Sequence, residues 1–204
     1  MKHPRAEFLI SLAAGGRVSA EGLPVVALVG RSNVGKSRLI NALANSRIAR
    51  AGAKPGTTRL VNVYRLSTGP PQARSMVIAD LPGYGYARGG QRTRRDFDDM
   101  TRGFFDQVEV SPSAPDAVRL AAVVLVVDIR HPGLESDLDT HRWALDSGYP
   151  VLAVVTKSDR VSRTAGARMV LEHAAALGTA VVPVSAKTGA GIQKVWAGLR
   201  ALVY

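Results

Sequence analysis

Short motifs in this chain carry residue types suited to binding a nucleoside triphosphate. The first, Gly30-Arg31-Ser32-Asn33-Val34-Gly35-Lys36-Ser37, has the G-x-x-x-x-G-K-S spacing of a phosphate-binding loop. Glycines let backbone N–H groups close around phosphates, and the N-terminus of a following helix adds partial positive charge. Lys36 can bridge the terminal phosphates, and Ser37 can ligate Mg²⁺. A chance glycine turn is the alternative, but a predicted strand before the motif and a predicted helix after it favour the phosphate loop.

The second motif is Asp80-Leu81-Pro82-Gly83, which ends another apolar run. The Asp80 carboxylate would face the phosphate loop from a neighbouring strand and hold Mg²⁺ through its water shell, and Gly83 would sense the γ-phosphate. Alone, this sequence is also a common turn. Downstream of a phosphate loop it becomes a second, supporting element, so the two motifs together predict a nucleoside triphosphate as ligand.

The third motif indicates which base is bound. Thr156-Lys157-Ser158-Asp159 follows one apolar run, and Ser185-Ala186-Lys187 follows the next. Asp159 can accept from both N1–H and the exocyclic amine of guanine, a donor pair that adenine lacks. The Lys157 stem can lie over the purine face, and the Ala186 N–H can donate to the guanine carbonyl oxygen. A simple helix cap is the alternative for the first tetrapeptide, but the paired Ser-Ala-Lys favours GTP.

The elements that must position these motifs alternate between strand and helix patterns. Continuous apolar runs predict strands at Val25–Val29, Leu60–Leu66, Ser75–Ala79, Leu120–Val127, Val151–Val155 and Ala180–Val184. Amphipathic patterns predict helices at Lys36–Ala44, Arg94–Val108, Asp137–Ser147, Ser162–Leu177 and Ile192–Val203.

These patterns predict an α/β fold of the P-loop NTPase type, similar to a small G protein. Runs of Val, Ile and Leu suit strands buried on both faces, so we expect a mostly parallel six-stranded sheet with helices on both sides. The second and third strands flank a turn-rich stretch with Gly69, Pro70 and Pro71, which favours an antiparallel hairpin and one antiparallel edge strand. We expect one domain over residues 1–204, with residues 1–23 as an N-terminal extension.

Composition and charge indicate where the protein acts and which partners it could bind. The chain has no cysteine and no apolar run long enough for a membrane helix, so we expect a cytoplasmic protein. Its 27 Lys and Arg against 16 Asp and Glu give a net charge of +11. Such an excess favours nucleic acid or another polyanion through phosphate contacts, although a merely soluble basic protein is the alternative. No obligate oligomer is implied.

The motifs together resemble the EngB family of ribosome-assembly GTPases, an Era-like family of the TRAFAC class. The resemblance spans nearly the whole chain. Its marks are the phosphate loop, Asp80-Leu81-Pro82-Gly83-Tyr84-Gly85-Tyr86-Ala87, Val127-Asp128-Ile129-Arg130 and a Thr opening the guanine motif. Pro55-Gly56-Thr57-Thr58 and Ser185-Ala186-Lys187 depart from the usual pattern and also occur in Era-like relatives. Era and the tandem-domain Der are therefore rivals, but neither fits the length.

The resemblance implies further roles for single residues. Gly56, Thr57 and Thr58 would lie in the first switch and contact the nucleotide, with Thr58 ligating Mg²⁺ when GTP is bound. Ras-like proteins place a water-positioning Gln where Tyr84 stands, so intrinsic hydrolysis should be slow. Asn33 corresponds to an Asn that helps related GTPases to hold K⁺ beside the phosphates, so stimulation by K⁺ is a hypothesis. Lys36, Thr58, Gly83 and Asn33 are the candidate catalytic residues.

The resemblance also implies a cellular role. The GTP form would bind the large ribosomal subunit or its precursor, in contact with rRNA, and hydrolysis would permit release; EngB proteins are also associated with normal septation. A basic segment around the second switch could contact rRNA, or it could be a solvated face balanced by nearby Asp residues. The segment contains Arg88, Arg92, Arg94, Arg95 and Arg102. The alternative function is a guanine-nucleotide sensor for a protein partner without RNA contact, and an ATP-dependent kinase is disfavoured by Asp159.

Overall fold

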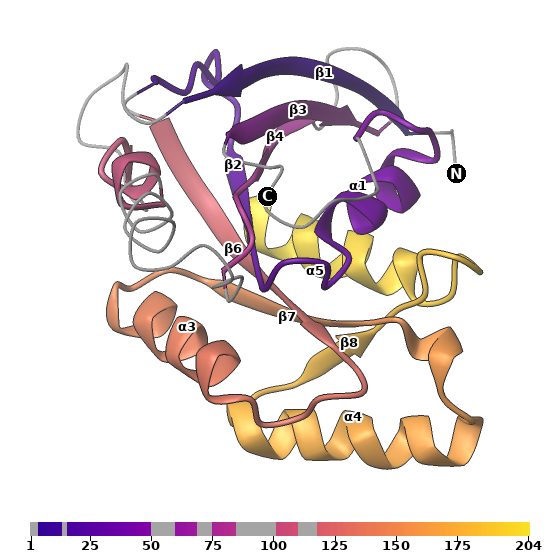
Figure 1. Cartoon of the computed structure of the whole chain (residues 1–204). Coiled ribbons are helices and arrows are strands. Elements are labelled where there is room, and N and C mark those ends of the chain that lie inside the picture. The colour runs from indigo at the N-terminus through magenta and orange to yellow at the C-terminus, as the bar shows by residue number, and fades with distance from the viewer. Residues whose placement is uncertain (1–3, 14–15, 50–59, 69–74, 85–100, 110–117) are drawn as a thin grey trace.

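The computed structural model describes residues 4–13, 16–49, 60–68, 75–84, 101–109 and 118–204, and its strands form a single sheet (Figure 1). The main path runs β1-β3-β4-β2-β6-β7-β8, and β5 pairs with the start of β6. The strands are β1 (Arg5–Leu12), β2 (Val25–Val29), β3 (Val61–Ser67), β4 (Ser75–Asp80), β5 (Val108–Glu109), β6 (Val118–Asp128), β7 (Val151–Thr156) and β8 (Val181–Pro183). The helices are α1 (Lys36–Ala44), α3 (Glu135–Asp146), α4 (Arg163–Leu177) and α5 (Ile192–Val203), with a 3₁₀ turn, η1, at Ser158–Arg160.

The central strands are parallel and buried on both faces, which is what their continuous apolar sequences require. Side chains alternate between the faces with a period of two residues. Val25, Ala27 and Val29 of β2 join one core with residues of α3 and α4, whereas Val26 and Leu28 join a second core with α1 and α5. Figure 1 shows these helix pairs on opposite sides of the sheet. The predicted fold class is therefore confirmed.

The antiparallel edge is wider than the sequence indicated. β3 and β4 form the expected hairpin, and β1 adds a second antiparallel strand outside β3. β1 comes from the stretch assigned to the N-terminal extension. Its residues are mostly exposed or half-buried, and its register shifts between Phe8 and Ile10, so it lacks the apolar run that identified the other strands.

The helix ends agree closely with the patterns except near Val108. α1 and α5 have the predicted bounds. α3 begins two residues and ends one residue before its predicted bounds, and α4 begins one residue later than predicted. The helix expected at 94–108 is described only from residue 101. Its predicted end is wrong, because Val108 belongs to strand β5 and pairs with Val118 of β6. The Gln107 amide donates to the carbonyls of Gly103 and Gly16, which satisfies the helix end and ties it to the N-terminal segment.

Within the described ranges, no helix combines the length and apolar character needed to cross a bilayer.

Candidate nucleotide-binding site

The phosphate loop follows β2 and depends on glycine at both ends. Gly30 has φ 151°, and a Cβ there would lie 2.4 Å from the Val126 carbonyl oxygen of β6. Gly35 has φ 117° and stands at the N-cap of α1. The left-handed region favours glycine, and the close approach at Gly30 leaves no room for a side chain. The loop therefore packs directly on the sheet and leads into a helix N-terminus, as predicted.

Lys36 is buried at the first position of α1. Its Nζ donates to the carbonyl oxygens of Gly30 at 2.8 Å and Arg31 at 3.4 Å, so the ammonium lies along the inside of the loop. Burial lowers the pKa of Lys36, and the attraction of Asp80 opposes that effect. A buried cation next to loop amides is suited to contact phosphate oxygens.

Ser37 and Asp80 meet at the ends of α1 and β4. The Ser37 hydroxyl donates to Asp80 Oδ2 at 2.9 Å, whereas Oδ1 is buried without a hydrogen-bond partner among the described atoms. Burial raises the pKa of Asp80, and Lys36 and Ser37 lower it. A hydroxyl beside an unsatisfied carboxylate oxygen fits the hard oxygen ligands that Mg²⁺ prefers. The described residues contain no group of three or more His, Cys, Asp or Glu side chains that could hold a metal by themselves, so any such ion would need other ligands.

The loop after β4 lies against the phosphate loop. A Cβ at Gly83 would stand 2.6 Å from both Cα and N of Ser32, so only glycine permits this approach. The Ser32 N–H donates to the Tyr84 carbonyl at 2.9 Å, and Arg31 and Tyr84 form an isolated β-bridge. The structure thus brings together the first two motifs, which are about 50 residues apart in the chain.

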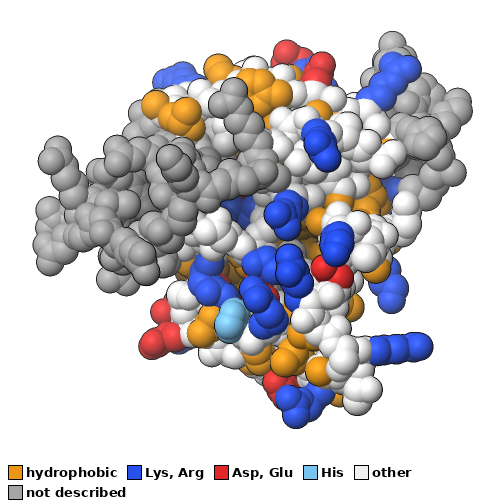
Figure 2. Space-filling model, turned by 45° about the vertical axis from the view of Figure 1, so that its right-hand side comes forward, with side chains coloured by type: hydrophobic (Ala, Val, Ile, Leu, Met, Phe, Trp, Pro, Cys, Tyr) orange, Lys and Arg blue, Asp and Glu red, His pale blue; other side chains and the backbone are white. Residues whose placement is uncertain are grey.

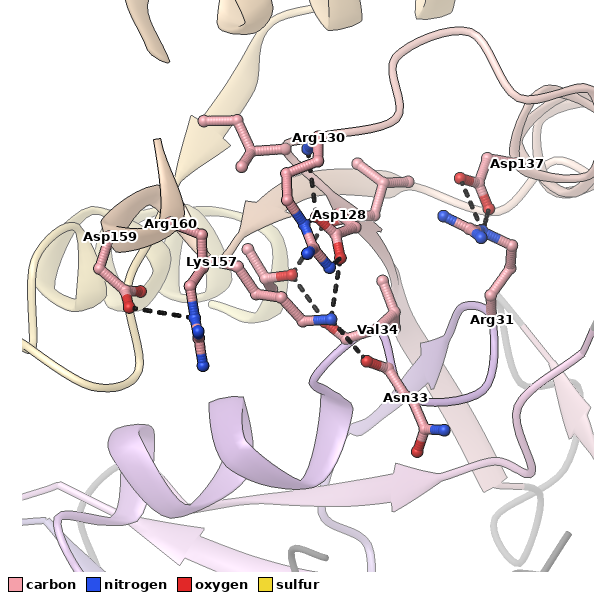
Figure 3. A network of polar contacts seen from close by, with 12 residues as sticks. Arg31, Asn33, Val34, Asp128, Arg130, Asp137, Lys157, Asp159 and Arg160 are labelled. Carbon is pink, nitrogen blue, oxygen red and sulfur yellow. Dashed lines mark hydrogen bonds and ion pairs between the residues drawn. The ribbon is translucent and has the colours of Figure 1, made fainter. Parts of the chain in front are cut away.

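Thr156 and Lys157 join the third motif to the same loop, and Figure 3 shows Lys157 beside Asn33. The buried Thr156 hydroxyl lies 2.7 Å from the Val34 carbonyl oxygen and 3.0 Å from that of Val127. Lys157 adopts φ 61°, and its Nζ donates to the Asn33 carbonyl at 2.7 Å and to Asp128 Oδ2 at 2.8 Å. The Lys157 stem is therefore held next to the phosphate loop, where a base attached to the bound phosphates would lie.

Asp159 sits in η1 with its carboxylate fixed by the motif after β8. The Ser185 hydroxyl donates to Asp159 Oδ1 at 2.6 Å, and the Ser158 N–H donates to the Val184 carbonyl. The hydrogen bond from Ser185 lowers the pKa of Asp159. Asp159 is thus an ionised acceptor next to Ala186 and Lys187, the arrangement expected for reading guanine. Gly56, Thr57 and Thr58 lie outside the described residues.

Asp128, to which the sequence analysis assigned no role, lies at the carboxyl end of β6 and binds two basic side chains. Both of its oxygens accept from Arg130, at 3.0 Å and 2.8 Å, and Oδ2 also accepts from Lys157 (Figure 3). Burial acts to raise the pKa of Asp128, but the hydrogen bonds from Arg130 and Lys157 outweigh it and lower the pKa. Its position directly after a buried strand was the available signal, because polar residues there face ligands in α/β sheets.

Asp137, in the first turn of α3, is a second buried carboxylate at the site. It accepts from Arg31 Nε at 3.3 Å and from the Tyr84 hydroxyl at 2.9 Å. Burial raises the pKa of Asp137, whereas Tyr84 and Arg31 lower it. Burial also raises the pKa of Tyr84, and the nearby Asp137 adds to that increase. No sequence motif pointed to this contact.

Exposed basic side chains lie beside acidic residues of the site. Figure 2 shows Lys and Arg gathered near the middle of one face, with the acidic side chains more scattered. Arg130 and Arg160 are exposed, and their only ion pairs among the described residues are with Asp128 and Asp159 of the site. This face is thus suited to an anionic ligand or partner.

Comparisons with known proteins agree with this geometry. Residues 25–157 match the protein family described as "50S ribosome-binding GTPase". A relative from Symbiobacterium thermophilum, "Probable GTP-binding protein EngB", is 35% identical over 228 residues, covering 96% of this chain and 94% of the relative.

Solved structures share the fold. The structure titled "Crystal structure of a probable GTP-binding protein engB" aligns with a TM-score of 0.65 and 20% identity over 88% of this chain and 98% of that chain. A structure of Era with MgGDPNP and a segment of 16S ribosomal RNA aligns with a TM-score of 0.70 and 20% identity, over 90% of this chain but 57% of the Era chain. The alignment therefore leaves much of the Era chain unmatched.

Proposed function

The chain belongs to the EngB family of P-loop GTPases, and from this premise we propose that it is a GTP-driven switch that assists assembly of the large ribosomal subunit. One observation carries the nucleotide part: Asp159, held by Ser185, and the phosphate loop are fixed to each other through Thr156 and Lys157. A guanine base and a triphosphate can therefore be read by one site.

The ribosomal part rests on the family and on charge. The matching family is described as ribosome-binding, and the chain carries a net charge of +11. A basic face near the nucleotide would gain affinity for rRNA by releasing counterions from its phosphates. With a ribosomal partner the protein would act in the cytoplasm, and a need for normal septation would follow from ribosome supply.

Different residues of the site would have different roles in GTP hydrolysis. Lys36 would contact the terminal phosphates, and the backbone N–H groups of the loop would hold their oxygens. Ser37 and Asp80 would hold Mg²⁺, which when bound neutralises the phosphate charge that develops during hydrolysis. Gly83 would sense the γ-phosphate. Gly56, Thr57 and Thr58 would form the first switch, with Thr58 as a further Mg²⁺ ligand.

Tyr84 supports slow intrinsic hydrolysis. Its hydroxyl donates to Asp137 on α3, so the side chain at the position of the water-positioning Gln of Ras-like proteins is directed to a helix. The same observation favours the second candidate function, a guanine-nucleotide sensor that acts on a protein partner.

Co-sedimentation with purified ribosomal subunits tests the two functions. Protein loaded with a non-hydrolysable GTP analogue is expected to pellet with the large subunit at moderate salt, and protein loaded with GDP is expected to stay in solution. Binding should fall steeply as salt is raised, because phosphate contacts dominate. If neither form pellets, although both nucleotides are shown to be bound, the sensor for a protein partner replaces the assembly factor.

Asn33 supports a proposal that K⁺ acts as a further cofactor. Its side chain is exposed on the phosphate loop, and Figure 3 shows its amide directed away from Lys157. We expect GTP turnover to be several-fold faster in K⁺ than in Na⁺, since a monovalent cation there adds positive charge beside the phosphates. Steady-state phosphate release in the two salts measures this, and Asn33→Ala should remove the difference. Equal rates in both salts would contradict the proposal.

A further inference from the structure

Tyr84, the residue after Gly83, is held at both of its ends. Its carbonyl oxygen accepts from the Ser32 N–H of the phosphate loop at 2.9 Å, and its hydroxyl donates to Asp137 of α3 at 2.9 Å. The backbone that carries Gly83 therefore cannot leave the phosphate loop without pulling the tyrosine away from α3.

Asp137 in turn is tied to the phosphate loop. Arg31 Nε lies 3.3 Å from both carboxylate oxygens, and the Asp137 side chain is 5% exposed. The carboxylate thus links α3, the phosphate loop and the loop after β4 at one point. Burying a carboxylate is costly, and an apolar side chain could fill the same space, so packing alone does not account for an acid here.

We propose that Asp137 is a positioning residue: it holds Tyr84, and through it the Gly83 peptide, at the phosphate loop, and so sets the preference for GTP over GDP. The proposal rests on the role of Gly83 in sensing the γ-phosphate. GDP has no γ-phosphate, so a correctly placed Gly83 favours GTP alone. A peptide that is already held in place loses less freedom when the γ-phosphate binds, which favours GTP further.

Affinities for GDP and for a non-hydrolysable GTP analogue, measured by fluorescence titration with Mg²⁺, test this assignment. Tyr84→Phe removes only the hydroxyl, and Asp137→Ala removes its acceptor. Each is expected to weaken binding of the analogue by about tenfold, because a hydrogen bond to a charged group is lost. Binding of GDP should change by less than about twofold in Tyr84→Phe. The double variant should match Asp137→Ala, because that change already removes the acceptor of the Tyr84 hydroxyl together with the partner of Arg31.

Asp139→Ala is the matched control on the same helix. Asp139 is exposed and ion-paired with Arg142, so this variant should leave the ratio of the two affinities unchanged. Equal losses for both nucleotides in Tyr84→Phe, or an unchanged ratio, would overturn the proposal, since a merely structural contact affects both states alike.

Gly83→Ala distinguishes the role of Gly83 from that of Asp137. If it reduces the preference for the analogue while Asp137→Ala and Tyr84→Phe do not, Gly83 senses the γ-phosphate and the role of Asp137 is wrong. If it leaves the preference intact, the role of Gly83 is wrong and the proposal fails with it.

Discussion

Asp159→Asn is expected to weaken binding of guanine nucleotides by about 100-fold to 1,000-fold, since charge-assisted hydrogen bonds to N1–H and the exocyclic amine are lost. Xanthine carries a carbonyl in place of that amine, so the amide N–H of asparagine can donate to it. The Ser185 hydroxyl can still donate to the asparagine oxygen, which keeps the new side chain in place. The protein should therefore bind xanthine nucleotides more tightly than guanine nucleotides, as measured by competition against a fluorescent nucleotide.

Asp159→Ala serves as the control for this exchange. Alanine offers neither acceptor nor donor, so this variant should lose guanine nucleotides and gain no affinity for xanthine nucleotides. Adenine nucleotides should stay weak in all three proteins. Guanine affinity within about threefold of the unchanged protein in Asp159→Asn would falsify the assignment of Asp159 to the base.

Lys36→Ala is expected to weaken GTP binding by at least about 100-fold and to abolish measurable turnover, because the buried ammonium is the cation placed inside the phosphate loop. Isothermal titration gives the affinity, and phosphate release gives the turnover. Guanosine without phosphates should bind Lys36→Ala and the unchanged protein alike, since the base-reading residues are untouched.

Arg38→Ala is the matched control for the lost charge. Arg38 lies two residues further along α1 and is exposed, so the same change in net charge is made outside the loop. We expect GTP affinity to change by less than about twofold in this variant. A similar loss in both variants would show that general electrostatic attraction, and not the placement of Lys36, holds the phosphates.

The sequence predicted the parts of the site whose signals are local. Each motif comes directly after an apolar run, so the rule that parallel strands present ligands at their carboxyl ends was enough to place Lys36, Asp80 and Asp159 together. The alternation of strand and helix patterns predicted the mostly parallel sheet, but it did not predict the order of the strands.

Contacts made by residues outside the recognised motifs could not be predicted. Asp137 meets Arg31 and Tyr84 only because α3 packs against β6 and β7, which brings its first turn to the loops that follow β2 and β4. Nothing in the sequence around Asp137 marks this contact. β1 was missed because an edge strand covered on one side needs no continuous apolar run. The role of Thr58 stays a prediction, since that residue lies outside the described ranges.

The bonds from Thr156 and Lys157 to the carbonyls of Val34 and Asn33 have an energetic consequence. Because these bonds join protein atoms, the loop that binds the base and the loop that binds the phosphates are held in a fixed relative position. Once either half of a nucleotide is seated, the other half meets its partners at a high effective concentration instead of searching for them. Binding of the base and binding of the phosphates thus strengthen each other. A molecule that carries only the base or only the phosphates is expected to bind much more weakly than the whole nucleotide.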